Sequence, residues 1–177
     1  MPVTLQTSLL APPKGAPGAG GFYAWWVTRG ALYGVPECLH PRDSNLSLLY
    51  VGISPARLSS TQTIRRRLLG NHINGNTSSS TFRFVLASLL LNSLDLHPFR
   101  TATKVNLNAA DNQRLRNWQM DNLRLTWCER ERPWEIEEQV IAAMQPPLNS
   151  AGNHAHPFFA TVKASRAAFR AAATALP

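Results

Sequence analysis

The 177-residue chain carries 18 Lys and Arg against 10 Asp and Glu, which gives a formal net charge of +8 and an isoelectric point near 10.5. Hydrophobic residues make up 44% of the chain and charged residues only 16%, so the composition excludes a fully disordered protein and predicts one domain with a buried core. No apolar run approaches the roughly 20 residues of a membrane-spanning helix, and we expect no secretory signal. The two cysteines lack metal-ligand spacing, so we expect a cytoplasmic protein without membrane contact.

The basic excess is dominated by arginine, with 15 Arg to 3 Lys, and it is unevenly distributed. Residues 57–83 contain five Arg and no acid, and residues 151–177 contain three basic residues and no acid. Half of all the acids fall within residues 129–138. A genome rich in G and C would equally favour arginine codons, so the distribution carries more weight than the total. Arginine suits phosphate oxygens, and segregated positive charge predicts a polyanionic partner.

Two strands and a short helix are expected in the first part of the chain. Residues 11–20 are Ala, Pro and Gly with one Lys, which predicts a flexible lead-in. The aromatic run 21–27, with glycine at its start, predicts a strand, and residues 46–53 predict a second strand antiparallel to it. Residues 63–69 predict a short helix that ends near Gly70.

The rest of the chain is expected to be mainly helical, with one more strand over residues 123–129, where apolar and polar residues alternate. The first of these helices shows apolar residues at three- and four-residue spacing, and the third has acids in its first turn, where the helix dipole favours them. The expected helices cover residues 81–94, 109–122, 134–144 and 161–175.

This order of elements predicts an α+β fold, in which a small three-stranded antiparallel sheet is flanked by helices. We expect residues 1–20 to form the flexible lead-in and residues 21–160 to form the folded domain. We expect residues 161–177 to form a C-terminal helix that packs on the domain or extends it.

Five motifs occur along the chain in a consistent order. They are Gly21-Phe22-Tyr23, Tyr50-Val51-Gly52, Ile64-Arg65-Arg66-Arg67-Leu68, Glu137-Glu138-Gln139-Val140-Ile141, and Pro146 with Asn149. Together they resemble the GIY-YIG nuclease domain, with Phe22 and Val51 in place of the usual isoleucines. Longer segments, including residues 146–158, resemble a bacterial stand-alone branch of that family. The resemblance extends over about residues 20–170.

The resemblance implies a catalytic site for phosphodiester cleavage. Its candidate residues are Tyr23, Tyr50, Arg67, His72, Glu137 and Asn149. One of the two tyrosines, acting through His72 or a metal-bound water, would deprotonate the nucleophile, and the sequence leaves open which one. Arg67 would stabilise charge on the scissile phosphate, and Glu137 would hold one Mg²⁺ or Mn²⁺ ion. Asn149 would orient the metal site or a phosphate through its amide.

One spacing departs from the family pattern, because His72 follows Arg67 by five residues instead of the usual four. On a continuous α-helix, five residues correspond to a rotation of about 140° and four residues to about 40°. Either the helix breaks at Gly70 and redirects His72, or another arginine of the trio contacts the phosphate. Arg65 lies seven residues from His72 and Arg66 lies six, whereas the motif itself favours Arg67.

A further set of basic residues is expected to bind the nucleic-acid backbone. These residues are Arg57, Arg65, Arg66, Arg83, Lys163 and Arg166. The resemblance implies a metal-dependent endonuclease, with DNA favoured over RNA and with structure-selective or weakly sequence-specific cleavage, since no zinc finger or added reader domain is evident. Two alternatives remain at this point: a nucleic-acid-binding module without catalysis, and a toxin or defence component whose substrate is set by a partner. A homodimer or an inhibitor partner is also left open.

Overall fold

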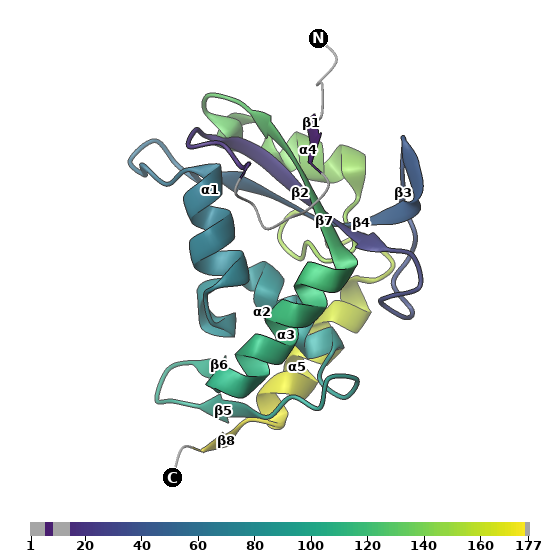
Figure 1. Ribbon diagram of the computed structural model, residues 1–177, viewed down its shortest axis with the longest axis vertical. Coiled ribbons are helices and arrows are strands. Elements are labelled where there is room, and N and C mark those ends of the chain that lie inside the picture. The colour runs from purple at the N-terminus through teal and green to yellow at the C-terminus, as the bar shows by residue number, and fades with distance from the viewer. Residues whose placement is uncertain (1–5, 9–14, 176–177) are drawn as a thin grey trace.

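The computed structural model describes residues 6–8 and 15–175, with the main sheet in the upper half of Figure 1 and α2, α3 and α5 in the lower half. The main sheet has five antiparallel strands in the order β1-β7-β2-β4-β3. These strands are β1 (Gln6–Ser8), β2 (Gly21–Thr28), β3 (Leu39–His40), β4 (Asp43–Ser54) and β7 (Leu123–Glu129).

The α+β class is confirmed, and the three predicted strands form the centre of the sheet as β7, β2 and β4. The expectation of only three strands is wrong, because β1 and β3 add a strand at each edge. These edge strands have three and two residues, which is too short to show an alternating pattern in the sequence.

Helices connect and cover these strands. They are α1 (Ile64–Arg66) with its π-helical continuation η1 (Arg67–Ile73), the 3₁₀ turns η2 (Thr77–Ser79) and η3 (Pro133–Glu135), α2 (Thr81–Leu89), α3 (Ala109–Asn122), α4 (Glu137–Met144) and α5 (Phe159–Ala171). A second sheet with the order β6-β5-β8 closes the lower end of Figure 1. Its strands are β5 (Pro98–Arg100), β6 (Val105–Leu107) and β8 (Thr174–Ala175).

Several helix boundaries differ from the expected ones. The helix expected to reach residue 94 ends at Leu89, and the helix expected from residue 134 begins at Glu137 after a 3₁₀ turn. The last helix ends at Ala171, and the chain then forms β8, which pairs in parallel with β5. In contrast, the helix over Ala109–Asn122 and the strand over Leu123–Glu129 have the predicted bounds.

Both faces of the central strands are covered. Successive residues of a strand point to opposite faces, so neighbouring residues belong to different cores. On one face, Trp25 stacks on Phe82 of α2, with ring centroids 5.1 Å apart, in the larger core. On the other face, Trp26 belongs to a smaller core against which Val140 and Met144 of α4 pack. The sheet therefore lies between α4 on one side and the remaining helices on the other.

Residues 15–20, which composition predicts to be flexible, pack against the start of α1. The Ile64 N–H donates to the carbonyl of Ala19 at 2.9 Å, and the Arg65 N–H donates to that of Pro17 at 3.1 Å. These carbonyls satisfy backbone donors that the first turn of a helix leaves without intrahelical partners. In the rest of the predicted lead-in, residues 6–8 form β1, and the other residues lie outside the described part of the chain.

Candidate active site

Two neighbouring strands bring the two signature tyrosines to one face of the sheet. In the register of β2 and β4, Tyr23 pairs with Gly52 and Trp25 pairs with Tyr50. Paired residues share a face, so both tyrosines point to the larger core. A Cβ atom at Gly52 would collide with the ring and hydroxyl of Tyr23. Gly52 therefore leaves the space that the Tyr23 ring occupies.

The helix that carries the arginine trio changes its hydrogen-bonding pattern before His72. Thr63 caps α1, and the chain continues without a break into η1, where the Asn74 N–H donates to the Leu69 carbonyl five residues earlier, at 2.9 Å. One turn of a π-helix spans one residue more than an α-helical turn. The five-residue interval between Arg67 and His72 is therefore about one turn of η1.

This π-helical turn corrects the expectation that the helix ends at Gly70. It also separates the three arginines. The positive charge of Arg67 lowers the pKa of both signature tyrosines and of His72. Neither Arg65 nor Arg66 contributes to those shifts, and both side chains are exposed. The structure brings Arg67 to the two tyrosines.

His72 is fully buried and forms hydrogen bonds through both ring nitrogens. Its Nε2 lies 2.7 Å from the Tyr23 hydroxyl, and its Nδ1 lies 2.6 Å from Ser80 Oγ. Burial, with smaller contributions from the Arg67 and Arg83 charges, places the pKa of His72 well below its ordinary value. The imidazole is therefore neutral around pH 7 and carries one proton.

The Ser80 hydroxyl indicates which ring nitrogen carries that proton. Ser80 Oγ accepts a hydrogen bond from the backbone N–H of Arg83 at 3.0 Å. Among the described residues, His72 Nδ1 is the acceptor that the hydroxyl proton of Ser80 can reach. We therefore assign Ser80 as donor to Nδ1 and the Nε2–H group of His72 as donor to Tyr23. Ser80 also caps α2, and no pattern in the sequence indicates its contact with His72.

The two tyrosines are protonated around neutral pH in this state. Burial raises the pKa of Tyr50 to about 12, with the Arg67 charge opposing the shift and the Glu137 charge adding to it. Burial raises the pKa of Tyr23 further, and the neighbouring Tyr50 adds to that increase. The charges of Arg67 and Glu137 therefore both reach the two tyrosine hydroxyls.

Glu137 approaches this group from the other side of the sheet. It is the first residue of α4, and its side chain is half-buried. Burial, followed by the charge of Glu138, raises the pKa of Glu137. Glu138 itself is exposed, and Glu135 forms an ion pair with Arg132 at 3.3 Å. Among the acids at the start of α4, Glu137 is therefore the one whose charge reaches the tyrosines. We call Tyr23, Tyr50, Arg67, His72 and Glu137 the tyrosine cluster.

Asn149 lies at the edge of β4 and supports the cluster through the backbone. Its Oδ1 accepts from the Val51 N–H at 2.9 Å, and its Nδ2 donates to the Val51 carbonyl at 2.8 Å. Next to it, the Leu148 N–H donates to the Leu49 carbonyl at 2.9 Å. The Asn149 amide is thus engaged by the strand that carries Tyr50, instead of pointing to a metal or a phosphate as the sequence reasoning expected.

The basic residues expected to bind nucleic acid do not form a single group. Arg57, Arg66 and Lys163 are exposed, and Arg166 is half-buried. The expectation for Arg83 is wrong. Its side chain is fully buried, and its guanidinium donates to backbone carbonyls and to the side chains of Asn112 and Gln119. Arg65 is exposed, and its Nε donates to the Ala16 carbonyl at 2.7 Å.

Among the described residues, no group of three or more His, Cys, Asp or Glu side chains could hold a metal ion. Glu137 forms no ion pair with any of the residues that the structure describes. An unpaired, half-buried carboxylate is nevertheless suited to Mg²⁺ or Mn²⁺, since Mg²⁺ keeps several of its water ligands and needs few protein oxygens.

Comparison with protein families indicates a nuclease-type fold. The family model described as the GIY-YIG catalytic domain matches residues 21–168. The chain therefore belongs to the GIY-YIG family. Comparison with curated proteins gave no match, and neither did comparison with solved structures. Within the described residues, no helix has the length and apolarity needed to cross a membrane.

Proposed function

We propose that this chain is a metal-dependent endonuclease that hydrolyses phosphodiester bonds, with DNA favoured over RNA. The observation that carries the proposal is the placement of Arg67 and Glu137, whose charges shift the pKa of both signature tyrosines in opposite directions. A cation that can stabilise a phosphate and a carboxylate that can hold a metal thus act electrostatically on the same two hydroxyls. Membership of the GIY-YIG family supports this assignment.

In this proposal, Arg67 stabilises the negative charge that develops on the phosphate during cleavage. Its side chain is half-buried, and it has no salt bridge with an acid among the described residues. A fixed cation in a partly desolvated site stabilises such charge more strongly than an exposed one. Arg67 is therefore available to a substrate phosphate.

The hydrogen-bonded chain from Ser80 through His72 acts on Tyr23. With Nε2–H donating to the Tyr23 oxygen, His72 stabilises any negative charge that forms there, and the Arg67 charge lowers the pKa of the same hydroxyl. The proton of Tyr23 then faces away from His72. We infer that Tyr23 first releases its own proton to solvent and then, as a tyrosinate, accepts the proton of the attacking water, while Tyr50 positions the phosphate.

The cofactor in this proposal is Mg²⁺ or Mn²⁺, held by Glu137 together with water and substrate oxygens. When bound, the ion would supply a Lewis acid for the leaving oxygen. The carboxylate must be ionised to hold it, and the raised pKa of Glu137 predicts that metal affinity falls as the pH is lowered.

Metal dependence and substrate class are tested together. The purified chain is incubated with supercoiled DNA, linear duplex, single-stranded DNA and RNA, with Mg²⁺, with Mn²⁺ or with EDTA. We expect cleavage of DNA with either metal and none with EDTA. Cleavage that persists in EDTA would contradict the metal assignment, and cleavage restricted to RNA would contradict the preference for DNA.

A nucleic-acid-binding module without catalysis is the second candidate. The observation in its favour is that burial keeps both tyrosines protonated around neutral pH, so that neither is ready to act as a base without a further change. This candidate predicts salt-sensitive binding of nucleic acid and no product with any metal. The same incubation distinguishes it from the proposed nuclease.

A further inference from the structure

A second group of basic side chains lines a hollow on α5, outside the tyrosine cluster. Lys163, Arg166 and Arg170 lie three and four residues apart, so they share one face of the helix. Together with Ser150 and His154, they line a hollow of about 470 Å³, which we call the α5 pocket.

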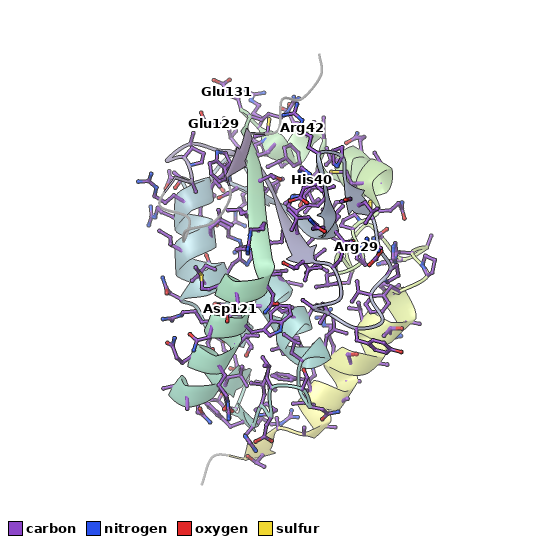
Figure 2. The ribbon with its side chains drawn as sticks, turned by 45° about the vertical axis from the view of Figure 1, so that its right-hand side comes forward. Arg29, His40, Arg42, Asp121, Glu129 and Glu131 are labelled. Atoms are coloured by element: carbon purple, nitrogen blue, oxygen red, sulfur yellow. The ribbon has the colours of Figure 1, made fainter. Side chains whose placement is uncertain are left out.

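No acid neutralises these three cations. The sequence contains no Asp or Glu after Glu138, and no salt bridge among the described residues includes an α5 side chain. Figure 2 shows Glu129 and Glu131 at the upper end of the molecule, away from α5. The positive potential of the α5 pocket is therefore not cancelled by a nearby ion pair.

Both arginines lie against an aromatic ring, with Arg166 half-buried and Arg170 exposed. Their guanidinium carbons lie over the ring of Phe84 on α2, at 5.5 Å for Arg166 and 4.8 Å for Arg170. Arg166 Nη1 donates to Ser150 Oγ at 3.3 Å, whereas Arg166 Nε is buried without an acceptor among the described residues. Burial, with the charge of Arg170, lowers the pKa of Arg166. A buried donor without an acceptor and two neighbouring positive charges both raise the free energy of the folded protein. An anion bound between them would lower that free energy.

The α5 pocket is connected to the tyrosine cluster through two consecutive residues. Ser150, which lines the pocket, follows Asn149, whose amide holds Val51 next to Tyr50. In the other direction, Arg170 also lines a second hollow, which contains Arg100 and Lys104 at the β5–β6 end. Positive side chains thus continue from the neighbourhood of β4 to the lower end of the molecule in Figure 1.

We propose that the α5 pocket binds a backbone phosphate of the nucleic-acid substrate, away from the scissile phosphate, and that Arg166 and Arg170 hold it. The planar guanidinium groups match phosphate oxygens, and the exposed Lys163 adds charge at the rim. This inference rests on the proposed function, because it assigns a second contact with the same substrate. It makes the α5 pocket a positioning site, separate from the bond that is cut.

The test measures binding without cleavage. Fluorescence anisotropy with labelled single-stranded and duplex DNA, in EDTA, compares the unaltered chain with the double variant Arg166→Gln/Arg170→Gln across a range of salt concentrations. The matched control is Arg42→Gln/Arg124→Gln, which also removes two positive charges. Arg42 lies in the turn before β4, and Arg124 lies in β7. Figure 2 shows Arg42 well away from α5. Lys163→Gln is included because that side chain is exposed and its loss should not affect folding.

We expect the α5 double variant to lose roughly tenfold in affinity at moderate salt, and the slope of log K against log salt to fall by about 1 to 2. The control should change affinity by less than about threefold, and Lys163→Gln should lie between the two. Equal losses in the α5 variant and the control, at matched thermal stability, would overturn the inference while leaving the proposed nuclease intact. Failure of the unaltered chain to bind any nucleic acid would overturn both.

A free nucleotide could supply the same phosphate chemistry, and a competition experiment separates the two sources. A nucleoside 5′-monophosphate should displace the labelled DNA only at millimolar concentrations. Tight binding of the monophosphate that Arg166→Gln/Arg170→Gln abolishes, with DNA binding unchanged, would contradict the assignment to a backbone phosphate.

Discussion

Arg83 and Arg66 belong to the same basic stretch of sequence, yet their side chains have opposite environments. Arg66 is exposed, whereas the Arg83 guanidinium is buried and donates to the carbonyls of His72, Ile73 and Asn112 at 3.0–3.2 Å. Burial, with the charge of Arg116, lowers the pKa of Arg83 to about 10. Arg83 therefore connects α2 to η1 and α3, and it indirectly holds His72 in place.

We expect Arg83→Ala to destabilise the protein by about 3 kcal/mol, because several buried carbonyls lose their donor. The melting temperature should fall by roughly 6–12 °C for a chain of this size. The matched control Arg66→Ala should change stability by less than about 0.5 kcal/mol. Thermal denaturation measures both, and similar melting temperatures for the two variants would show that Arg83 does not connect these elements.

The neutral, buried state of His72 predicts how stability depends on pH. The unfolded chain binds a proton at histidine near pH 6.5, whereas burial keeps the folded His72 neutral to a much lower pH. Between these two values the unfolded state holds more protons, so stability decreases as the pH falls. The contribution of one such group approaches about 1.4 kcal/mol per pH unit.

His72→Gln removes this titrating group. Denaturant unfolding of both proteins at pH 7.5 and pH 5.5 should show a smaller loss of stability in the variant, and other titrating groups cancel in the comparison. If both proteins lose the same stability over this range, His72 is not kept neutral by burial.

At the scale of elements, the π-helical turn of η1 decides which arginine faces the tyrosines. Propensity rules place a helix end at Gly70, since glycine favours the left-handed C-terminal position. In the structure Gly70 does not adopt a positive φ, and apart from its chain neighbours and the backbone of its own helix no atom lies within 4 Å of where its Cβ would be. Gly70 is therefore an ordinary position within a continuing helix.

This geometry predicts that Gly70→Ala stabilises the protein by about 0.5–1 kcal/mol, because alanine loses less conformational freedom in a helix. Gly75, a few residues later, provides the contrast. A Cβ at Gly75 would lie only 2.5 Å from the Asn71 carbonyl oxygen, so Gly75→Ala should be destabilising. The free energies of unfolding check both expectations. A destabilising Gly70→Ala would favour the helix end predicted from the sequence.

The sequence predicts those elements whose pattern is local. The aromatic run of β2 and the alternation of β7 predict both strands to within a residue, and Asn108 marks the start of α3. The switch to π-helical hydrogen bonding in η1 has no such pattern. The second sheet has no such pattern either, because its strands have only two or three residues and β8 pairs with a distant segment.

The same distinction applies to the candidate site. The family motifs predict Tyr23, Tyr50, Arg67 and Glu137, and in the structure the charges of Arg67 and Glu137 act on Tyr23, near the start of β2, and on Tyr50. The partners of Arg83 come from η1 and α3, so its burial depends on contacts between distant segments. The link from Ser80 to His72 depends on the same kind of contact.

Across the whole molecule, the charged residues behind the net charge of +8 lie in different environments. The tyrosine cluster combines one arginine with one carboxylate, the α5 pocket combines three cations, and Arg83 contributes a charge that no ligand can reach. In Figure 1, β2 and β4 lie in the upper half and α5 extends to the lower end. A nucleic acid that contacts both regions would run along the molecule.

The most direct test of the central claim compares single-turnover cleavage of DNA by Glu137→Ala and by its neighbour Glu138→Ala. Both variants remove one acid from the first turn of α4, but only Glu137 acts on the two tyrosines. We expect Glu137→Ala to reduce the rate at least about 100-fold, and Glu138→Ala to change it less than about threefold. Equal rates for the two variants would contradict the assignment of Glu137 as the catalytic carboxylate.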